Sequence, residues 1–189
     1  MRYRTWFLLT AALPCFGQSI ASKCPNLNSL TGLPNPTTVI NSATLNPPRT
    51  AQGNAPALPE HCEVQGRMNE RTGVNSQRYA IRFHLRLPTD WNGKFFFEGG
   101  GGSNGNLGNA LGNLQGQQRG NALAIGFAVI STDSGHDNAV NNDPARNGTL
   151  TFGFDPQARR DFGYNSYDQV AQAAKAIINA YYGRAIERS

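Results

Sequence analysis

Alternating apolar and polar positions predict a β-hairpin near the middle of the chain. The segment YAIRFHLRL, residues 79–87, has an apolar residue at every second position. A period of two over this length is typical of a strand with one buried face. The preceding segment CEVQGRMN, residues 62–69, can pair with it through the turn TGVNSQ, residues 72–77. On this pattern His84 belongs to the polar face, and we expect its side chain to face solvent.

The hydrophobic pattern downstream predicts alternating strands and helices. Lys94–Glu98 (KFFFE) and residues 127–131 (FAVIS) are short, largely apolar runs of the kind found in strands buried on both faces. Residues 114–125 between them are a candidate helix. Strands that alternate with helices favour parallel pairing, right-handed crossovers and a site on the loops at the strand ends. The predicted fold class is therefore α/β.

The clearest predicted helix begins at Ser166 and ends at Gly183. Ser166 and Gln169 have the spacing of a capping box, and glycine commonly ends a helix. One face of this segment is apolar: Tyr167, Val170, Ala171, Ala174, Ile177, Ile178 and Tyr181.

The first 21 residues have the layout of a secretory signal peptide. Arg2 and Arg4 precede the apolar run WFLLTAAL, residues 6–13, and small residues follow up to Ala21. The apolar run is too short to span a bilayer. We therefore expect cleavage near Ala21 and a secreted or periplasmic chain that has no membrane partner.

Two cysteines remain once the predicted signal peptide, residues 1–21, has been removed. An oxidising compartment favours pairing of Cys24 with Cys62, although two unpaired thiols are the alternative. A bond between them would stabilise the fold by roughly 3–4 kcal/mol. It would attach an irregular Pro- and Asn-rich leader, residues 22–60, to the partial catalytic domain expected over residues 61–189.

The composition is that of one globular, loop-rich domain. The 189 residues are 39% hydrophobic and 15% charged. The formal net charge is +5, to which Arg2 and Arg4 of the signal peptide contribute, and the other basic residues are scattered. A nucleic-acid surface usually needs a clustered basic face, so we expect no nucleic-acid partner.

In the stretch KFFFEGGGGSNGN, residues 94–106, the predicted strand ends at Glu98 and a glycine-rich loop follows. This loop matches three functional patterns. The first is the dinucleotide fingerprint GxGxxG, satisfied by Gly100, Gly102 and Gly105. That fingerprint needs an acidic residue about 20 positions downstream to bind the ribose. Neither Asp nor Glu occurs between Glu98 and Asp133, which argues against a dinucleotide cofactor.

The second pattern is the nucleophile elbow GxSxG, satisfied by Gly101, Ser103 and Gly105. An elbow turns directly into a helix, but the following NGNLGNALGN would place glycines inside the first turns. Each interior glycine costs about 1 kcal/mol relative to alanine. Asp133 and His136 would also have to complete a triad from one short loop, so the sequence disfavours this interpretation.

The third pattern is an oxyanion loop, in which a main-chain N–H faces the negative oxygen of an ester intermediate. Glycines suit such a loop because a side chain would hinder the approach of substrate. On pattern alone, a plain flexible loop is an equal alternative. Asp133, His136 and Asp137 follow the second apolar strand, and we interpret them first as turn formers, with substrate contact by His136 as the alternative.

Four segments together resemble the tannase and feruloyl esterase family of secreted α/β-hydrolases. They are ALPEHCEV (57–64), LPTDWNGKFFFEGGGGSNG (87–105), TDSGHDNAVN (132–141) and FGFDPQARRDFGYNSYDQV (152–170). They occur in the family's order and cover most of the chain after residue 56, so they are more specific together than any single motif.

The resemblance implies an esterase that cleaves aromatic carboxylic esters through an acyl-serine intermediate. It assigns to the N–H of Gly102 one half of the oxyanion hole, and it implies a disulfide between Cys24 and Cys62. It also implies that the family's calcium site lies in a lid that this chain does not match, so we expect no cofactor or metal within these residues.

The sequence departs from the family pattern at its end. In the family, the helix that ends AYYGRA leads into a short strand, a Gly-Cys-Ser-x-Gly-Gly nucleophile turn and the lid, and none of these is matched here. We therefore expect part of an α/β-hydrolase fold, truncated before the nucleophile strand and lid, with negligible esterase activity alone. The alternative is a non-catalytic exported binding or scaffold protein, or a truncated relic.

Overall fold

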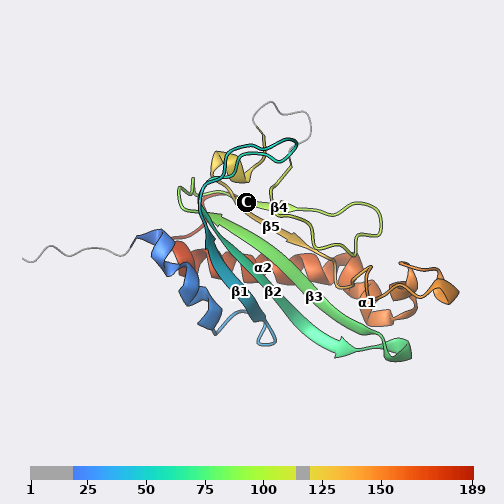
Figure 1. Cartoon of the computed structure of the whole chain (residues 1–189). Coiled ribbons are helices and arrows are strands. Elements are labelled where there is room, and N and C mark those ends of the chain that lie inside the picture. Colours follow the sequence, from blue (N-terminus) through green and yellow to red (C-terminus); the bar gives the residue numbers. More distant parts are fainter. Residues whose placement is uncertain (1–18, 114–119) are drawn as a thin grey trace, which may run out of the picture.

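The structure is a computed structural model that describes residues 19–113 and 120–189. Its centre is a five-stranded mixed sheet with the strand order β1-β2-β3-β5-β4 (Figure 1). The strands are β1 (Val39–Asn46), β2 (His61–Thr72), β3 (Arg78–Pro88), β4 (Phe95–Glu98) and β5 (Ala128–Thr132). The helices after the last strand are α1 (Pro156–Arg160) and α2 (Ser166–Tyr182). The prediction of an α/β fold is confirmed.

The predicted hairpin is present, and the two apolar strands downstream pair with each other. β2 and β3 are antiparallel, with Val64 opposite Leu85. β4 and β5 are parallel, with Phe95 opposite Ala128, and β5 is also antiparallel to β3. Because β4 and β5 run in the same direction, their carboxyl ends lie at the same edge of the sheet.

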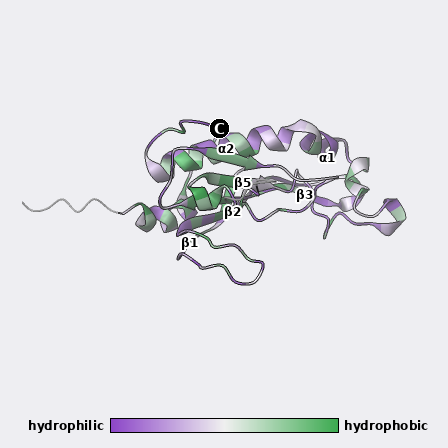
Figure 2. Ribbon diagram, turned by 90° about the horizontal axis from the view of Figure 1, so that it is seen from above, coloured by the Kyte–Doolittle hydropathy of each residue, from purple (hydrophilic) through white to green (hydrophobic). Residues whose placement is uncertain are grey.

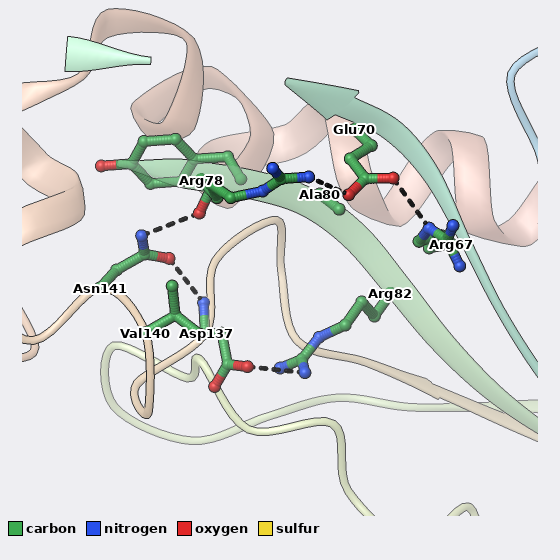
Figure 3. A pocket seen from close by; sticks show the side chains of 9 residues that line it. Arg67, Glu70, Arg78, Ala80, Arg82, Asp137, Val140 and Asn141 are labelled. Carbon is green, nitrogen blue, oxygen red and sulfur yellow. Dashed lines mark hydrogen bonds and ion pairs between the residues drawn. The ribbon is translucent and has the colours of Figure 1, made fainter. Parts of the chain in front are cut away.

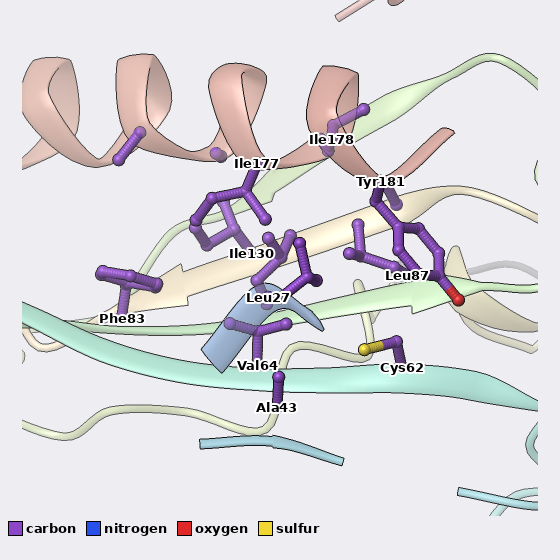
Figure 4. Packing of buried hydrophobic residues seen from close by; sticks show 14 of the residues in the cluster. Leu27, Ala43, Cys62, Val64, Phe83, Leu87, Ile130, Ile177, Ile178 and Tyr181 are labelled. Atoms are coloured by element: carbon purple, nitrogen blue, oxygen red, sulfur yellow. The ribbon is translucent and has the colours of Figure 1, made fainter. Parts of the chain in front are cut away.

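The main hydrophobic core lies between α2 and one face of the sheet. Figure 2 shows α2 as a separate layer beside the strands, and Figure 4 shows Ile177 of α2 near Ile130 of β5, and Tyr181 of α2 near Leu87 of β3. All four side chains are fully buried. The alternating apolar residues of β3 belong to the same core, as the sequence predicts: Ile81, Phe83, Leu85 and Leu87.

The Pro- and Asn-rich leader is more regular than predicted. It contains a 3₁₀ helix, η1 (Ile20–Ser29), and the edge strand β1, which pairs antiparallel to β2. Cys24 of η1 forms a disulfide with Cys62 of β2, and their Cα atoms are 5.6 Å apart. Ala43 is the one buried residue of β1, so this strand has no apolar alternation that the sequence could reveal. Its structure comes from main-chain pairing with β2.

Two predicted segments lie partly or mostly outside the described residues. The signal peptide at residues 1–21 is one, and residues 114–119 of the predicted helix at 114–125 are the other. The described remainder of that helix is a single 3₁₀ turn, η3 (Leu123–Ile125), which ends at Gly126 with a φ of +89°, so the helix prediction is wrong there. Within the described ranges, no helix is long and apolar enough to cross a bilayer.

The C-terminal helical segment begins earlier than predicted. Asp155 caps α1, which continues through a π-helical turn, η6 (Asp161–Asn165), into α2. The capping box at Ser166 is therefore wrong, because Ser166 is a buried residue inside a continuous helical path. The predicted end is confirmed: Gly183 has a φ of +68°, and its N–H donates to the carbonyl of Asn179. Three more 3₁₀ turns are η2 (Val74–Ser76), η4 (Pro144–Arg146) and η5 (Thr151–Phe154).

The second face of the sheet is covered by loops, which changes the setting of His84. A smaller apolar cluster packs there, formed by Leu58, Phe96, Ala110, Leu111, Ala122, Leu123, Phe127 and Val129. His84 is only 5% exposed. Its Nε2 lies 2.7 Å from a carboxylate oxygen of Glu63, and its Nδ1 lies 3.1 Å from the carbonyl of Gly108. The prediction that His84 faces solvent is wrong, because the polar face of this strand carries a layer of loops.

Reduction of the Cys24–Cys62 disulfide should lower the free energy of unfolding by about 4 kcal/mol, because it releases a cross-link between residues 38 positions apart in the unfolded chain. Urea unfolding with and without dithiothreitol measures the difference. The double variant Cys24→Ser/Cys62→Ser should have the lower stability in both conditions. Equal midpoints for the wild-type chain with and without reductant would contradict this prediction.

Asp155 should stabilise the fold in a pH-dependent way. Burial raises the pKa of this carboxyl. Hydrogen bonds from the Arg71 guanidinium and from the main-chain N–H groups of Ala158 and Val74 have a larger effect in the opposite direction, so the pKa is lowered to about 2. Because the folded pKa lies below the unfolded value, the stabilisation is present above about pH 4 and is lost as the pH falls towards about 2.

The variant Asp155→Asn keeps a capping acceptor but removes the charge. It should lose about 2 kcal/mol of unfolding free energy at pH 7 and almost nothing at pH 2. Asp143→Asn is a matched control, because Asp143 also caps a short helix but is more exposed; its loss should stay below about 0.5 kcal/mol. If the difference in unfolding free energy between Asp155→Asn and wild type stayed the same from pH 7 to pH 2, the lowered pKa of Asp155 would be refuted.

Candidate active site

Two loops meet at the edge of the sheet where β4 and β5 end. The glycine loop, which we define as residues 99–108, follows Glu98 of β4, and the β5 loop, residues 133–141, follows Thr132 of β5. The N–H of Gly105 donates to the carbonyl of Asp133, at 3.2 Å. The parallel pairing of the strands therefore brings together two of the segments that the sequence singled out.

Gly102 lies at the tip of the glycine loop. It is the second residue of a four-residue turn that is closed by the Asn104 N–H donating to the Gly101 carbonyl, at 3.0 Å. Its φ is +58°, a left-handed conformation that favours glycine. A methyl group at Gly102 would meet no heavy atom within 4 Å, and no described residue accepts a hydrogen bond from its N–H.

The other glycines of the glycine loop divide into two kinds. A Cβ at Gly100 or Gly105 would collide with the amide side chains of Asn104 and Asn138, respectively, and a Cβ at Gly108 would lie 3.1 Å from the side chain of Ser131, so packing accounts for these three glycines. Gly99 and Gly101 have no positive φ and no neighbour within reach of a Cβ. Within the described part of the chain, neither packing nor backbone conformation requires glycine at those two positions.

Asn104 anchors the glycine loop to the β5 loop. Its Nδ2 donates to the carbonyl of Thr132, at 2.8 Å, and to the Oγ of Ser134, at 2.7 Å. Its main-chain carbonyl accepts a hydrogen bond from the Nδ2 of Asn138, at 2.6 Å. The loop is thus held by side-chain hydrogen bonds on both sides of the turn and is not simply a flexible connection.

Arg82 of β3 holds the β5 loop from the other side. Its Nε lies 2.6 Å from a carboxylate oxygen of Asp133, and its Nη1 lies 2.6 Å from one of Asp137. Figure 3 shows the Asp137 pair beside a pocket of about 220 Å³, together with the bond from the N–H of Asp137 to the side chain of Asn141. Asp133 is fully buried, and burial raises its pKa to about 6, although the hydrogen bonds and charge of Arg82 act in the opposite direction.

His136 lies inside the β5 loop, away from solvent. Its side chain is 1% exposed and stacks on Phe152, with ring centroids 3.8 Å apart. Neither ring nitrogen has a hydrogen-bond partner among the described residues. Burial lowers the pKa of His136, although the main-chain groups of Ser134 and Ser103 oppose the change in part. The ring is therefore a neutral packing element at neutral pH.

Two of the functional patterns in the glycine loop are not supported by this geometry. Both the dinucleotide fingerprint and the nucleophile elbow require a helix directly after the loop, and none occurs in residues 104–113. The carboxylate of Asp133 forms an ion pair with Arg82, and the His136 ring forms no hydrogen bond with the Ser103 hydroxyl. The described residues therefore contain no local triad around Ser103.

A cavity of about 330 Å³ lies against the glycine loop. Its lining is mostly main chain and amide side chains, and it comprises Glu98, Gly99, Gly100, Gly101, Asn104, Asn106, Gly108, Asn109, Asn113, Ser131 and Thr132. Glu98 accepts hydrogen bonds from the main-chain N–H groups of Gly112 and Asn113, each at 3.3 Å. The space beside the exposed main chain of Gly99–Gly101 is large enough for part of a small ligand.

The sequence pointed to Gly102 but missed the residues that hold it. Asn104 and Asn138 look like ordinary loop asparagines in the sequence, and Arg82 looks like one polar residue of an alternating strand. A signal was available in the loop itself, because an asparagine among glycines is suited to a left-handed conformation. In the described ranges, no three His, Cys, Asp or Glu side chains are grouped as metal ligands would be.

Comparison with known proteins identifies the family. The family model for tannase and feruloyl esterase matches residues 62–189, which is more than half of the chain. The chain belongs to the tannase and feruloyl esterase family. The matched range includes both loops of the candidate site.

Two curated proteins are similar in sequence to this family member. It is 53% identical over 156 residues to the mono(2-hydroxyethyl) terephthalate hydrolase of Piscinibacter sakaiensis, a match that covers 82% of this chain and 26% of that protein. It is 29% identical over 131 residues to an uncharacterized esterase of Agrobacterium fabrum, covering 68% of this chain and 22% of that protein. The chain thus spans about a quarter of the length of these relatives.

Two solved structures of esterases have a similar fold. A crystal structure of an esterase from Aspergillus oryzae matches with a TM-score of 0.58 at 19% identity, covering 89% of this chain and 31% of that one. Feruloyl esterase B from the same organism matches with a TM-score of 0.57 at 18% identity, covering 87% and 30%. The sheet and helix of this tannase and feruloyl esterase family member therefore match part of a larger α/β fold, as expected from the sequence.

His136 should make stability fall as the pH decreases below about 6.5. Its folded pKa lies below its unfolded value, so the unfolded chain takes up the proton first and unfolding becomes easier. The variant His136→Phe should remove this part of the pH dependence, as measured by urea unfolding between pH 7 and pH 5.

The wild-type curve also contains Asp133, whose raised pKa gives the opposite slope, and His61, whose pKa is lowered mainly by burial. The contributions of Asp133 and His61 cancel when the unfolding free energy of His136→Phe is subtracted from that of wild type at each pH, provided that Arg82 keeps its two ion pairs. His61→Phe serves as the comparison and should remove a separate share of the slope. An unchanged slope in His136→Phe would show that the ring can be protonated without cost in the folded chain.

Proposed function

We propose that this chain carries the oxyanion-binding part of a serine ester hydrolase active site. The observation that supports this best is the main chain at Gly102, whose N–H has no acceptor among the described residues and whose surroundings are open. The turn that presents it is fixed by Asn104 and lies where two parallel strands end. In an ester hydrolase, a pre-oriented N–H at such a position stabilises the negative oxygen of the tetrahedral intermediate.

The nucleophile, the triad acid and the triad histidine are proposed to come from residues outside these 189. The position for a nucleophile is suggested by the outer edge of β4, where Phe95 donates its N–H to the carbonyl of Arg188, at 2.9 Å, and Lys94 bridges to Arg188 in parallel. A strand that continued along this edge would end beside the glycine loop. A serine at its end would attack the ester carbonyl with histidine as base, while Gly102 holds the oxyanion.

The proposed substrates are esters of aromatic carboxylic acids. The names of the similar hydrolase and of the family support this class, since they refer to terephthalate, tannin and ferulate chemistry. We also propose export after cleavage near Ala21, which the Cys24–Cys62 disulfide supports. A calcium ion of the kind that the family resemblance implies would be held by residues other than the described ones, which offer no ligand cluster; calcium enters no step proposed here.

Gly102→Ala should reduce ester hydrolysis in a hybrid enzyme. In this hybrid, residues 62–189 replace the matching segment of the hydrolase from Piscinibacter sakaiensis. Alanine keeps the N–H but is strained at a positive φ by about 1–2 kcal/mol, so the turn should rotate and misdirect the donor. We expect kcat for an aromatic p-nitrophenyl ester to fall about 10- to 100-fold, since a lost oxyanion donor costs up to about 10³-fold.

Gly183→Ala is the matched control for backbone strain. Gly183 also has a positive φ and open space around it, but it ends α2 far from the glycine loop. The control should lose a similar amount of stability and keep its kcat. A hybrid in which Gly102→Ala and Gly183→Ala have equal kcat values would overturn the proposed role of Gly102, and an inactive hybrid that folds would favour a non-catalytic binding protein.

A further inference from the structure

A chain of three polar side chains lies directly behind the glycine loop. Asn104 donates from its Nδ2 to the Oγ of Ser134, at 2.7 Å, and Ser134 donates from its Oγ to the hydroxyl of Tyr167, at 3.0 Å. Asn104 is 8% exposed and Ser134 is fully buried. Tyr167 belongs to the first turn of α2, and its ring contacts Phe97 of β4, with centroids 5.6 Å apart. The chain connects the glycine loop to the helix through the β5 loop.

Both loop residues of this chain have a left-handed backbone conformation. Asn104 has a φ of +49° and Ser134 a φ of +61°, a region in which serine is strained, asparagine is better tolerated and glycine is unstrained. Glycine at either position would relieve the backbone, and this segment uses glycine freely. The side chains are therefore retained at a conformational cost, which the hydrogen bonds at 2.7 Å and 3.0 Å must offset.

Asn104 also controls the turn that contains Gly102. Its N–H closes the turn on the Gly101 carbonyl, and its side chain packs over Gly100 so closely that no Cβ would fit there. A rotation of Asn104 must therefore change the directions of the main-chain groups between Gly101 and Ser103. The far end of the hydrogen-bonded chain is rigid, because α2 is packed in the main core through Val170.

We propose that Asn104 is a positioning residue for the Gly102 N–H, held in place through Ser134 by the hydroxyl of Tyr167. This inference rests on the proposed function of Gly102 as an oxyanion donor. Tyr167 fixes the Ser134 hydroxyl, Ser134 accepts from the Asn104 amide, and Asn104 holds the turn in which the Gly102 N–H has no acceptor among the described residues. Helix α2 thereby sets the direction of a group that it does not touch.

The test uses the hybrid enzyme and two variants that preserve shape. Tyr167→Phe removes only the hydroxyl at the end of the chain, and Asn104→Asp replaces both donor hydrogens by an acceptor while keeping the size of the side chain. Tyr164→Phe is the matched control, because Tyr164 lies one turn earlier, is 67% exposed and has no side-chain hydrogen bond to a described residue. The measurements are kcat and KM for an aromatic p-nitrophenyl ester and the inhibition constant of phenylboronic acid, whose serine adduct places an oxygen in the oxyanion site.

We expect Tyr167→Phe to lower kcat about 5- to 10-fold and Asn104→Asp about 10- to 100-fold, with KM within about twofold of the parent. The boronic acid should bind more weakly by the same factors as kcat falls, because it samples the same donor. The double variant should be little worse than Asn104→Asp alone, since both changes act through one chain. Tyr164→Phe should match the parent in every measurement.

The outcomes separate this inference from the proposed function. If Gly102→Ala lowers kcat but Tyr167→Phe leaves kcat and boronic acid binding unchanged, the positioning role is overturned and the oxyanion role stands. If Gly102→Ala itself has no effect, both are overturned. A fall in kcat with a matching rise in KM and unchanged boronic acid binding would mean a general structural role and would also overturn the inference. Tyr167→Phe keeps the test decisive if Asn104→Asp fails to fold.

Discussion

The parallel pairing of β4 with β5 is the constraint on which the candidate site depends. Two strands that run side by side in the same direction must deliver their following loops to one edge of the sheet. Here those loops are the glycine loop and the β5 loop, and every contact between them follows from this arrangement. The return path after β5 runs through α2 and brings Arg188 into parallel register with Lys94 at the outer edge of β4. Strand, helix and bridge thus form a βαβ unit around the same edge.

The site is an ordered arrangement of left-handed backbone held by hydrogen bonds. Four left-handed positions, at residues 102, 104, 105 and 108, lie in the glycine loop, and two more, at 134 and 135, lie in the β5 loop. Glycine adopts this conformation without strain, whereas the non-glycine positions 104 and 134 depend on surrounding contacts to fix them. The buried contacts of Asn104 and the ion pairs of Arg82 supply that restraint here. The polar interior of the two loops therefore offsets the strain and leaves the main chain of Gly102 free for a ligand.

The sequence could predict the elements that bury a regular apolar face, and it did so for β2, β3, β4, β5 and α2. It could not reveal β1, whose stability comes from main-chain pairing. The start of the helical segment at Asp155 was missed although the sequence carries a signal for it, because Asp155 caps the helix and Pro156 takes its first position. His84 was misplaced because period-two alternation shows which face is polar but not whether loops cover that face. In the site, the sequence assigned an oxyanion role to Gly102 only through the family resemblance, and that role stays a prediction. The contacts of Arg82 and Asn138 could not be predicted, because each joins segments that are remote in sequence.

The glycine loop can keep its shape without a nucleophile strand beside it. On the proposed role of Asn104, the direction of the Gly102 N–H depends on Asn104, Ser134 and Tyr167, which form one hydrogen-bonded chain within the described residues. A nucleophile on a strand beside β4 would add no contact that the turn needs in order to keep its shape. An oxyanion donor has to be fixed before the reaction, because a donor that must reorient when negative charge develops stabilises the transition state less. On the proposed function, the strained backbone at Ser134 is a cost of holding the Gly102 N–H in one direction.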